Sequence, residues 1–230
     1  MRRGGQGVRF RRRLLAWYAR AARDLPWRRT RDPYRVLVSE VMLQQTQVSR
    51  VSDYYPRFLE RFPDLESLAR ARPRAVREAW DGLGYYARAR NLHELAKSVA
   101  RRHDATLPSD PAELIKLPGV GPYTAGAVAS FAYEKPVPAV DTNVARVIRR
   151  AFLGIREPKG GRRATWDVGR ATEDVRRATR QVAAALVPKD GKQAWKFNQA
   201  IMELGALICV ARKPKCPECP VRPVCRTGKA

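Results

Sequence analysis

Residues 117–141 read LPGVGPYTAGAVASFAYEKPVPAVD, and this stretch decides how the rest of the chain is interpreted. Residues 111–116 are typical of the end of a helix, and residues 123–133 of the next helix, with small apolar side chains on one face. Gly119 and Gly121 permit a very tight turn between them, because glycine adopts backbone angles that other residues rarely do. Such a turn points backbone N–H groups outward at the positive end of a helix, where phosphate oxygens can accept from them. We predict a helix–hairpin–helix that binds a nucleic-acid backbone; a plain turn between packed helices is the simpler alternative.

The charge balance indicates the kind of partner. The chain of 230 residues carries 46 Lys and Arg against 22 Asp and Glu, a formal net charge of +24. A balance this basic indicates a polyanionic partner. No stretch approaches the roughly 20 apolar residues of a membrane-spanning helix. The apolar run at residues 14–18 is too short for a signal peptide. We expect a cytoplasmic protein that associates with the nucleoid as a monomer, and neither a secreted nor a membrane protein.

Helical patterns fill most of the sequence, with short interruptions that carry Pro, Gly or Asp. We find no alternating strand pattern and no internal repeat, so the predicted fold class is all-α. Residues 1–13 hold six Arg and three Gly and predict a disordered basic arm, with helical patterning from Leu14 onward. Residues 156–170 predict an exposed loop, and Thr172 after them an N-cap. Further helices are predicted at residues 34–46, 54–62, 64–71, 73–80, 86–103, 142–152, 172–187 and 194–208.

Glu40 is the one acid in the helical segment of residues 34–46, YRVLVSEVMLQQT. Its neighbours three and four positions away are Val36, Leu37, Leu43 and Gln44. Three of these are apolar, so we expect a desolvated carboxyl whose pKa is raised, as a general acid requires. A Glu paired with one of the many arginines at the edge of the core is the alternative.

Asp141 lies twenty residues after Gly121, directly before the helical pattern of residues 142–152. At a helix N-terminus, backbone N–H groups favour an ionised carboxylate, although Asp is also an ordinary N-cap. Cleavage of a glycosidic bond uses two carboxyls whose pKa values are pushed apart. One protonates the leaving group and the other stabilises an oxocarbenium-like sugar. We therefore pair Glu40 and Asp141 as a hypothesis for such a reaction.

All four cysteines lie within the last 22 residues, in the pattern C-x6-C-x2-C-x5-C. Clustered thiols of this kind bind zinc or an iron–sulfur cluster. Only one tight C-x2-C pair is present, and the longer steps fit the wider reach of a cubane. We favour a structural iron–sulfur cluster over zinc. Its ligands would be Cys209, Cys216, Cys219 and Cys225.

The hairpin LPGVG, Asp141 and the cysteine spacing together resemble the helix–hairpin–helix DNA glycosylases with an iron–sulfur cluster, the endonuclease III superfamily. Three segments resemble its adenine DNA glycosylase (MutY) family: LPWRRTRDPYRVLVSEVMLQQTQV, WDGLGYYARARNLH and FNQAIMELGALIC. The resemblance covers nearly the whole chain, from about Leu25 to Cys225. It implies a two-lobed fold with three parts. These are a basic arm and first helix (1–26) that pack with the cluster lobe, a six-helix barrel lobe (27–135) with the hairpin motif at 111–133, and the cluster lobe (136–230).

The resemblance implies a base-excision-repair glycosylase that hydrolyses the N-glycosidic bond of adenine mispaired with 8-oxoguanine or guanine. Glu40 would protonate adenine at N7, Asp141 would stabilise the positive sugar, and Asn143 would position the groups around it. Tyr123 would line the site where bifunctional relatives carry a lysine that attacks the sugar. A phenol cannot form a Schiff base, so we expect a monofunctional enzyme with weak or no strand cleavage.

The resemblance also implies double-stranded DNA with a mismatched or oxidised base pair as the partner. Gln45 and Tyr85 would wedge into the duplex, while Arg28 and Leu43 would face the extruded adenine. Further expected DNA-binding or base-binding residues are Thr46, Arg88, Leu117, Gly119, Val120 and Gly121. The implied cofactors are a [4Fe–4S] cluster at the cysteines and a monovalent cation at the hairpin.

Two features depart from the family pattern. Its members usually continue past the cysteines into a domain that helps recognise 8-oxoguanine, whereas this sequence ends five residues after Cys225. We expect that domain to be absent and discrimination between 8-oxoguanine and guanine to be affected. Thr142 also stands where many members have Gly.

Two other functions compete with adenine excision. A thymine or uracil glycosylase acting opposite guanine would also suit Tyr123, but the segment SEVMLQQT with its Glu argues against it. A non-catalytic lesion sensor would be recognised by equal inertness of the wild type and Glu40→Gln.

Overall fold

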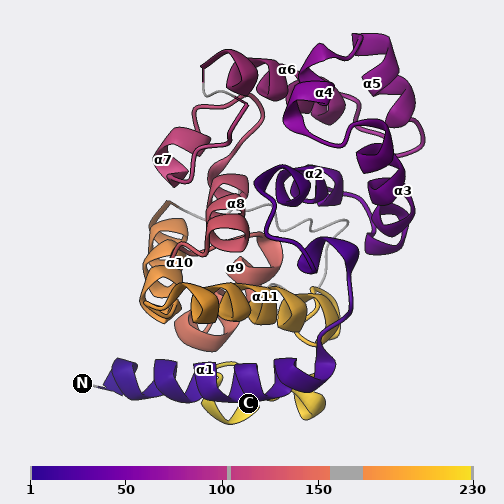
Figure 1. Cartoon of the computed structure of the whole chain (residues 1–230). Coiled ribbons are helices and arrows are strands. Elements are labelled where there is room, and N and C mark those ends of the chain that lie inside the picture. Colours follow the sequence, from indigo (N-terminus) through magenta and orange to yellow (C-terminus); the bar gives the residue numbers. More distant parts are fainter. Residues whose placement is uncertain (1, 103–104, 156–172, 229–230) are drawn as a thin grey trace. The chain divides into compact units, whose positions relative to one another are not determined.

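The structure is a computed structural model that describes residues 2–102, 105–155 and 173–228. Every regular element in these ranges is helical, which confirms the all-α fold class (Figure 1). The chain divides into two compact units, residues 24–135 on the one hand and residues 1–23 with 136–230 on the other. No helix in the described ranges combines the length and the apolar character needed to cross a membrane.

The unit of residues 24–135 holds the hairpin. Its elements are η1 (Pro26–Arg28), α2 (Pro33–Leu43), α3 (Val48–Arg61), α4 (Leu65–Arg70), α5 (Pro73–Ala79), α6 (Ala87–Arg102), α7 (Pro111–Leu114) and α8 (Pro122–Tyr133). Helix α2 packs against α8 and α3, and α6 packs against α4 and α5. Phe58 and Trp80 meet edge to face in the core, with ring centroids 5.7 Å apart. This packing places α2 beside the helix that follows the hairpin.

Aspartate side chains begin three helices of this unit. Asp32, Asp64 and Asp110 each accept a hydrogen bond from a backbone N–H in the first turn of α2, α4 and α7. Such caps satisfy donors that the helix itself leaves without partners. Helix α2 ends at Leu43, earlier than the predicted residue 46, because Gln45 adopts a left-handed conformation with φ of 57°. Helix α3 begins at Val48, before the predicted residue 54.

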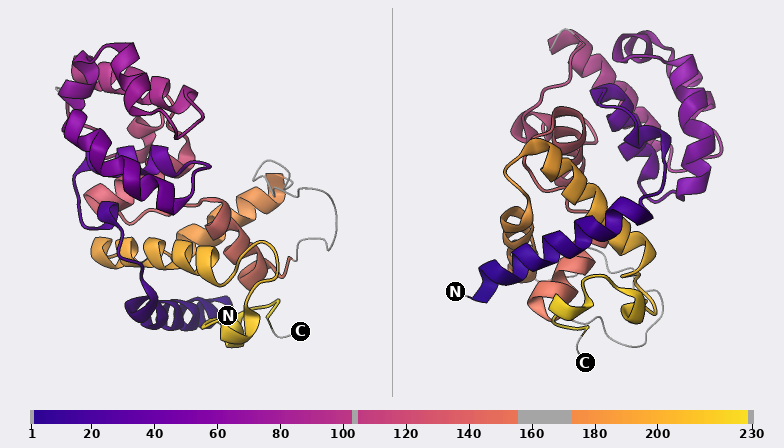
Figure 2. Two further views of the ribbon diagram at one scale, coloured as in Figure 1. Left: turned by 90° about the vertical axis from the view of Figure 1, so that its right-hand side faces the viewer. Right: turned by 60° about the horizontal axis from the view of Figure 1, so that its bottom comes forward.

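The other unit is built around one long helix. Its elements are α1 (Arg2–Ala21), α9 (Thr142–Ile148), the π-helical turn η2 (Arg149–Leu153), α10 (Glu173–Leu186), α11 (Gly191–Leu207), η4 (Cys216–Glu218) and η5 (Arg222–Val224). Helix α11 packs against α1 on one side and α9 on another (Figures 1 and 2). Phe197, Ile201 and Leu204 of α11 are buried in this core.

The prediction of a disordered arm over residues 1–13 is wrong, because α1 begins at Arg2. Phe10 and Leu14 are fully buried in the core of this unit. The Gln6 amide donates to the carbonyls of Ala151 at 3.1 Å and Val224 at 2.8 Å. Each glycine costs a helix about 1 kcal/mol relative to alanine. Burying one large apolar side chain returns about 1.5–3 kcal/mol. Tertiary burial therefore overrides the weak local preference.

The predicted loop at residues 156–170 and the predicted N-cap Thr172 lie outside the described residues. Helix α10 begins at Glu173 and ends at Leu186, one residue before the predicted end.

Candidate active site and cysteine pocket

The hairpin between α7 and α8 uses its two glycines differently. Gly119 has a φ of +76°, and a Cβ there would lie 2.7 Å from the Cβ of Asn91. Gly121 is the N-cap of α8 with an ordinary φ of −95°. A Cβ at Gly121 would meet nothing within 4 Å. Of the two glycines that permit a tight turn, only Gly119 adopts a backbone angle that other residues rarely do. Gly119 is required by the fold, whereas Gly121 leaves open space before the first N–H groups of α8.

The apolar side chains of the hairpin divide between the core and solvent. Leu117 and Val120 are buried, whereas Pro118 and Gly119 are exposed. Ile115 is 45% exposed, which is unusual for so large an apolar side chain. The hairpin thus exposes Ile115, Pro118 and Gly119 to solvent, while Leu117 and Val120 anchor the turn in the core.

The packing of α2 on α8 brings Glu40 and Tyr123 together. Glu40 is 3% exposed, between the buried side chains of Val36 and Leu37 and the half-buried Leu43. The Tyr123 hydroxyl donates a hydrogen bond to Glu40 Oε2 at 2.5 Å. The sequence prediction of a carboxyl on an apolar face is confirmed. The hydroxyl of Tyr123, in the first turn of α8, fixes one oxygen of that carboxyl.

Gln45 and Tyr85 lie on two loops with strained backbones. Both are exposed, Tyr85 by 60%, and both have positive φ, 57° for Gln45 and 49° for Tyr85. Non-glycine residues rarely adopt such angles, so these positions are held by their surroundings. The adjacent Tyr86 hydroxyl donates to Asp81 Oδ1 at 2.5 Å.

The structure also places the remaining predicted contact residues of this unit. Arg28 ends η1 and Leu43 ends α2, and both side chains are half-buried. Thr46 Oγ1 accepts a hydrogen bond from the Arg88 guanidinium at 3.0 Å. Arg88 itself is buried, and its hydrogen bonds run to acceptors of the protein rather than to solvent.

Asp141 lies in the other unit, as the N-cap of α9. Its Oδ1 accepts from the Val144 N–H at 2.6 Å, and its Oδ2 accepts from the Asn143 amide at 3.0 Å. The Asn143 oxygen in turn accepts from Arg146 at 2.7 Å. Both oxygens of the Asp141 carboxyl are thus held in place by α9 itself. Thr142, where many members of the resembled family have Gly, is exposed at the start of the helix.

Arg146 fixes this turn to two other segments of the same unit. Its guanidinium donates to the Gly205 carbonyl in α11 at 2.7 Å and to the Cys209 carbonyl at 2.8 Å. A Cβ at Gly205 would lie 2.7 Å from Asn143 Cβ, so only glycine permits this close approach of α11 to α9. Arg146 and Gly205 are not among the site residues predicted from the sequence. The signal for Arg146 was its place three residues after Asn143, on the same helix face.

Burial raises the pKa of Asp141 above its ordinary value. The Val144 N–H, the Asn143 amide and the Arg146 charge act in the opposite direction but do not outweigh the loss of solvent. The sequence led us to expect that the helix N-terminus would favour the ionised form. The contacts with these N–H groups are present, but the pKa of Asp141 is raised rather than lowered.

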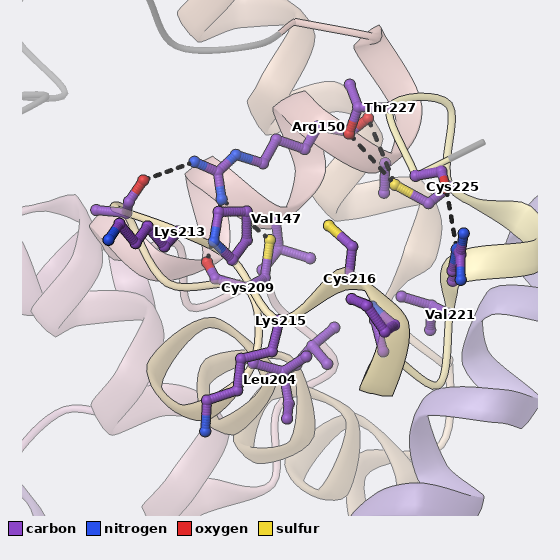
Figure 3. A pocket seen from close by; sticks show the side chains of 18 of the residues that line it. Val147, Arg150, Leu204, Cys209, Lys213, Lys215, Cys216, Val221, Cys225 and Thr227 are labelled. Carbon is purple, nitrogen blue, oxygen red and sulfur yellow. Dashed lines mark hydrogen bonds between the residues drawn. The ribbon is translucent and has the colours of Figure 1, made fainter. Parts of the chain in front are cut away.

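The four cysteines border one pocket, with a volume of about 580 Å³. All four thiols are free, and Figure 3 shows Cys209, Cys216 and Cys225 around the same space. Burial raises the pKa of the Cys209 thiol, and it raises that of Cys219 to about 11. Arg150 donates to Cys209 Sγ at 3.5 Å and to the carbonyls of the two residues after it.

This donor set fits a sulfur-ligated group. Within the described residues no three His, Cys, Asp or Glu side chains are gathered closely enough to hold a metal ion. All four cysteines nevertheless line the same pocket, so the candidate sulfur ligands lie in one region. The neighbouring Arg150 supplies positive charge beside a sulfur, as thiolate ligands favour.

Comparison with known proteins identifies the family. Residues 38–169 match the HhH-GPD superfamily of base excision DNA repair proteins. The chain is 46% identical over 209 residues to the adenine DNA glycosylase of Mycolicibacterium smegmatis, covering 90% of this chain and 66% of the relative. It is 41% identical over 228 residues to the human adenine DNA glycosylase, covering 94% of this chain and 39% of the relative.

Solved structures agree with this match. A thermostable thymine-DNA glycosylase superposes with a TM-score of 0.84 at 30% identity, covering 98% of both chains. Endonuclease III, trapped covalently on DNA in an estranged-adenine complex, gives a TM-score of 0.78 at 27% identity, covering 100% of this chain and 98% of that one.

The helical fold and the hairpin define a helix–hairpin–helix protein. Since the family match covers more than half of the chain, the protein belongs to the HhH-GPD superfamily of base excision DNA repair proteins. The chain spans no more than about two thirds of the length of the curated relatives that it matches.

The raised pKa of Asp141 predicts a pH-dependent stability. A carboxyl with a raised folded-state pKa binds more protons in the folded than in the unfolded chain. Its contribution to the free energy of unfolding therefore falls as pH rises above about 4. We expect the stability of the wild type relative to Asp141→Asn to decrease from pH 4 to neutral pH, as measured by urea unfolding.

Asp64 provides a control, because its contribution to stability should change with pH in the opposite direction. Hydrogen bonds from Ser67 hold the pKa of Asp64 below its ordinary value. Its contribution is lost as pH falls, so the wild type should gain stability relative to Asp64→Asn as pH rises. Equal slopes for the two variants would contradict the assigned environment of Asp141.

Proposed function

We propose that the protein is a monofunctional DNA glycosylase that removes adenine mispaired with 8-oxoguanine or guanine. One observation carries the proposal: the buried Glu40 carboxyl is held by the Tyr123 hydroxyl, directly after the hairpin. Relatives named adenine DNA glycosylase, at 46% identity, support adenine as the base. The lower identity of 30% to the thymine-DNA glycosylase structure favours adenine over thymine.

Glu40 is the proton donor in this proposal. Protonation of adenine turns the departing base into a neutral leaving group, so that the N-glycosidic bond can break. The apolar surroundings of Glu40 exclude water from that proton transfer. The hydrogen bond from Tyr123 holds Oε2 of this carboxyl in place.

Asp141 stabilises the positive charge that develops on the sugar. Its two oxygens accept from Val144 and Asn143, so the carboxylate is oriented before substrate binds. Because Tyr123 lacks an amine, no Schiff base with the sugar forms there. The product would be an abasic site with an intact strand.

The DNA partner is supported by charge and by the hairpin. A net charge of +24 favours a polyanion, and a Cβ at Gly121, the N-cap of α8, would meet nothing within 4 Å, so the helix N-terminus is open to a phosphate. Gln45 and Tyr85 are the exposed side chains proposed to enter the duplex where the base leaves it.

The cysteine pocket would hold a [4Fe–4S] cluster through Cys209, Cys216, Cys219 and Cys225. When bound, the cluster supplies a rigid cross-link between four points of a short loop. Arg146 and Arg150 donate to the carbonyl of Cys209 and so connect that loop to the helix that begins at Asp141.

Glu40→Gln tests the proposed proton donor. The amide keeps the shape of the side chain but cannot donate the acidic proton. Removing a general acid typically costs 10²–10⁴ in rate, so we expect at least about a 100-fold loss of single-turnover adenine release. The dissociation constant for a duplex with A opposite 8-oxoguanine should change by less than about threefold. Glu60→Gln, the same change at an exposed position of α3, should leave both values unchanged.

If the wild type and Glu40→Gln bind the lesion equally and neither releases a base from any duplex, the protein is a lesion sensor. That result would overturn the proposal.

The two hairpin glycines provide a matched pair of variants. Gly119→Ala forces alanine into a left-handed conformation, at about 1–2 kcal/mol, and crowds Asn91. We expect it to lower the free energy of unfolding by at least that amount. Gly121→Ala should leave stability within about 0.5 kcal/mol. It should weaken DNA affinity about tenfold at fixed salt, because the new methyl stands before the phosphate-binding N–H groups. Wild-type affinity in Gly121→Ala, measured by fluorescence anisotropy, would exclude phosphate binding at this turn.

A further inference from the structure

We propose that Arg88 is a positioning residue that joins the two DNA-inserting loops into one rigid wedge. The loops are the Gln45 loop (residues 44–47) and the Tyr85 loop (residues 81–86). The inference rests on the proposed function, because it assigns to Arg88 the geometry with which Gln45 and Tyr85 enter a duplex.

The Arg88 guanidinium hydrogen-bonds to both loops at once. Its first terminal nitrogen donates to the end of α2 and the Gln45 loop. Its acceptors are the carbonyls of Val41 at 3.0 Å, Met42 at 2.7 Å and Gln44 at 2.6 Å. Its second terminal nitrogen donates to Thr46 Oγ1 at 3.0 Å and to the carbonyls of Leu83 and Gly84, each at 3.1 Å. One planar group therefore spans the gap between two segments that are about forty positions apart in the sequence.

This arrangement fits positioning better than charge pairing. Arg88 is 8% exposed, and its acceptors in the described part of the chain are carbonyls and one hydroxyl, with no carboxylate. A buried charge without a counter-ion is costly unless its donors are satisfied. Both terminal nitrogens of Arg88 have acceptors, whereas its buried Nε has no hydrogen-bond partner. Only a group with several donors in a fixed plane can satisfy so many acceptors in both loops.

The residues that would enter DNA are those whose backbones need support. Gln45 and Tyr85 both have left-handed φ angles, and both are exposed. The Arg88 guanidinium carbon lies 5.5 Å from the centre of the Tyr85 ring and 5.4 Å from that of the buried Trp80. Arg88 thus contacts the Tyr85 ring as well as the backbone just before it.

Loops that are ordered before binding would lower the free-energy cost of binding DNA. Ordering two loops during binding costs conformational free energy, and a preformed wedge avoids that cost. The sequence suggested Arg88 as a DNA contact. In this proposal its effect on DNA is indirect, because both terminal nitrogens are already engaged by the protein.

Hydrogen exchange of the free protein tests, without any DNA, whether Arg88 joins the two loops. In Arg88→Met, amides of residues 44–47 and 81–86 should exchange at least tenfold faster in both loops together. Arg90→Met, an exposed change on the same helix α6, should affect neither loop. Arg88→Lys keeps the charge but lacks the planar fork, so both loops should again loosen. Loosening of one loop alone, or wild-type exchange in Arg88→Lys, would overturn the proposal.

A double-mutant cycle on DNA affinity tests whether the link between the two loops matters when the protein binds DNA. Gln45→Ala and Tyr85→Ala would be combined on a duplex with a non-hydrolysable 2′-fluoro adenosine opposite 8-oxoguanine. With Arg88 present, their effects on the dissociation constant should be non-additive by at least threefold, and in Arg88→Lys they should become additive. Equal coupling in both backgrounds would overturn the proposal. A wild type with no preference for the lesion duplex would overturn the proposed function instead. The hydrogen-exchange experiment would still decide whether Arg88 joins the two loops.

Discussion

The site in the unit of α9 and α11 depends on the buried guanidinium of Arg146. It donates to Asn143, to the Gly205 carbonyl in α11 and to the carbonyl of Cys209. Asn143 in turn orients Asp141. Arg146 therefore links the turn that carries the acid both to the long helix and to the cysteine loop, in addition to the packing of α9 on α11 and the hydrogen bonds of Arg150. Gly205 completes the constraint, because any Cβ at that position would displace Asn143.

In the unit of residues 24–135, a buried arginine likewise holds separate segments in a fixed arrangement. Arg88 engages main-chain carbonyls at the ends of two loops, and Tyr123 holds the Glu40 carboxyl. In a chain with 46 Lys and Arg, most of the positive charge can serve a polyanion, but these two buried arginines serve the fold. Main-chain carbonyls are suitable partners for such arginines. A single carboxylate would hold the guanidinium at one point, whereas several carbonyls along a loop hold the course of its backbone.

Features that depend on local pattern could be predicted from the sequence. The helical fold class, the apolar face around Glu40 and the N-cap position of Asp141 are all visible as spacing along the chain. Prediction failed where distant segments decide the outcome. Burial of Phe10 orders an arm that composition describes as disordered, and burial reverses the expected pKa direction of Asp141. Arg146 and Gly205 were missed because their partners lie up to sixty-three positions away.

Single-turnover base release tests the central claim most directly. Duplexes with A opposite 8-oxoguanine, A opposite G, and T or U opposite G would each be incubated with excess protein. Each product would be divided and analysed with and without alkali. We predict that adenine alone is released and that the strand breaks only after alkali treatment. Release of thymine or uracil, or strand cleavage without alkali, would contradict the roles given to Glu40 and Tyr123.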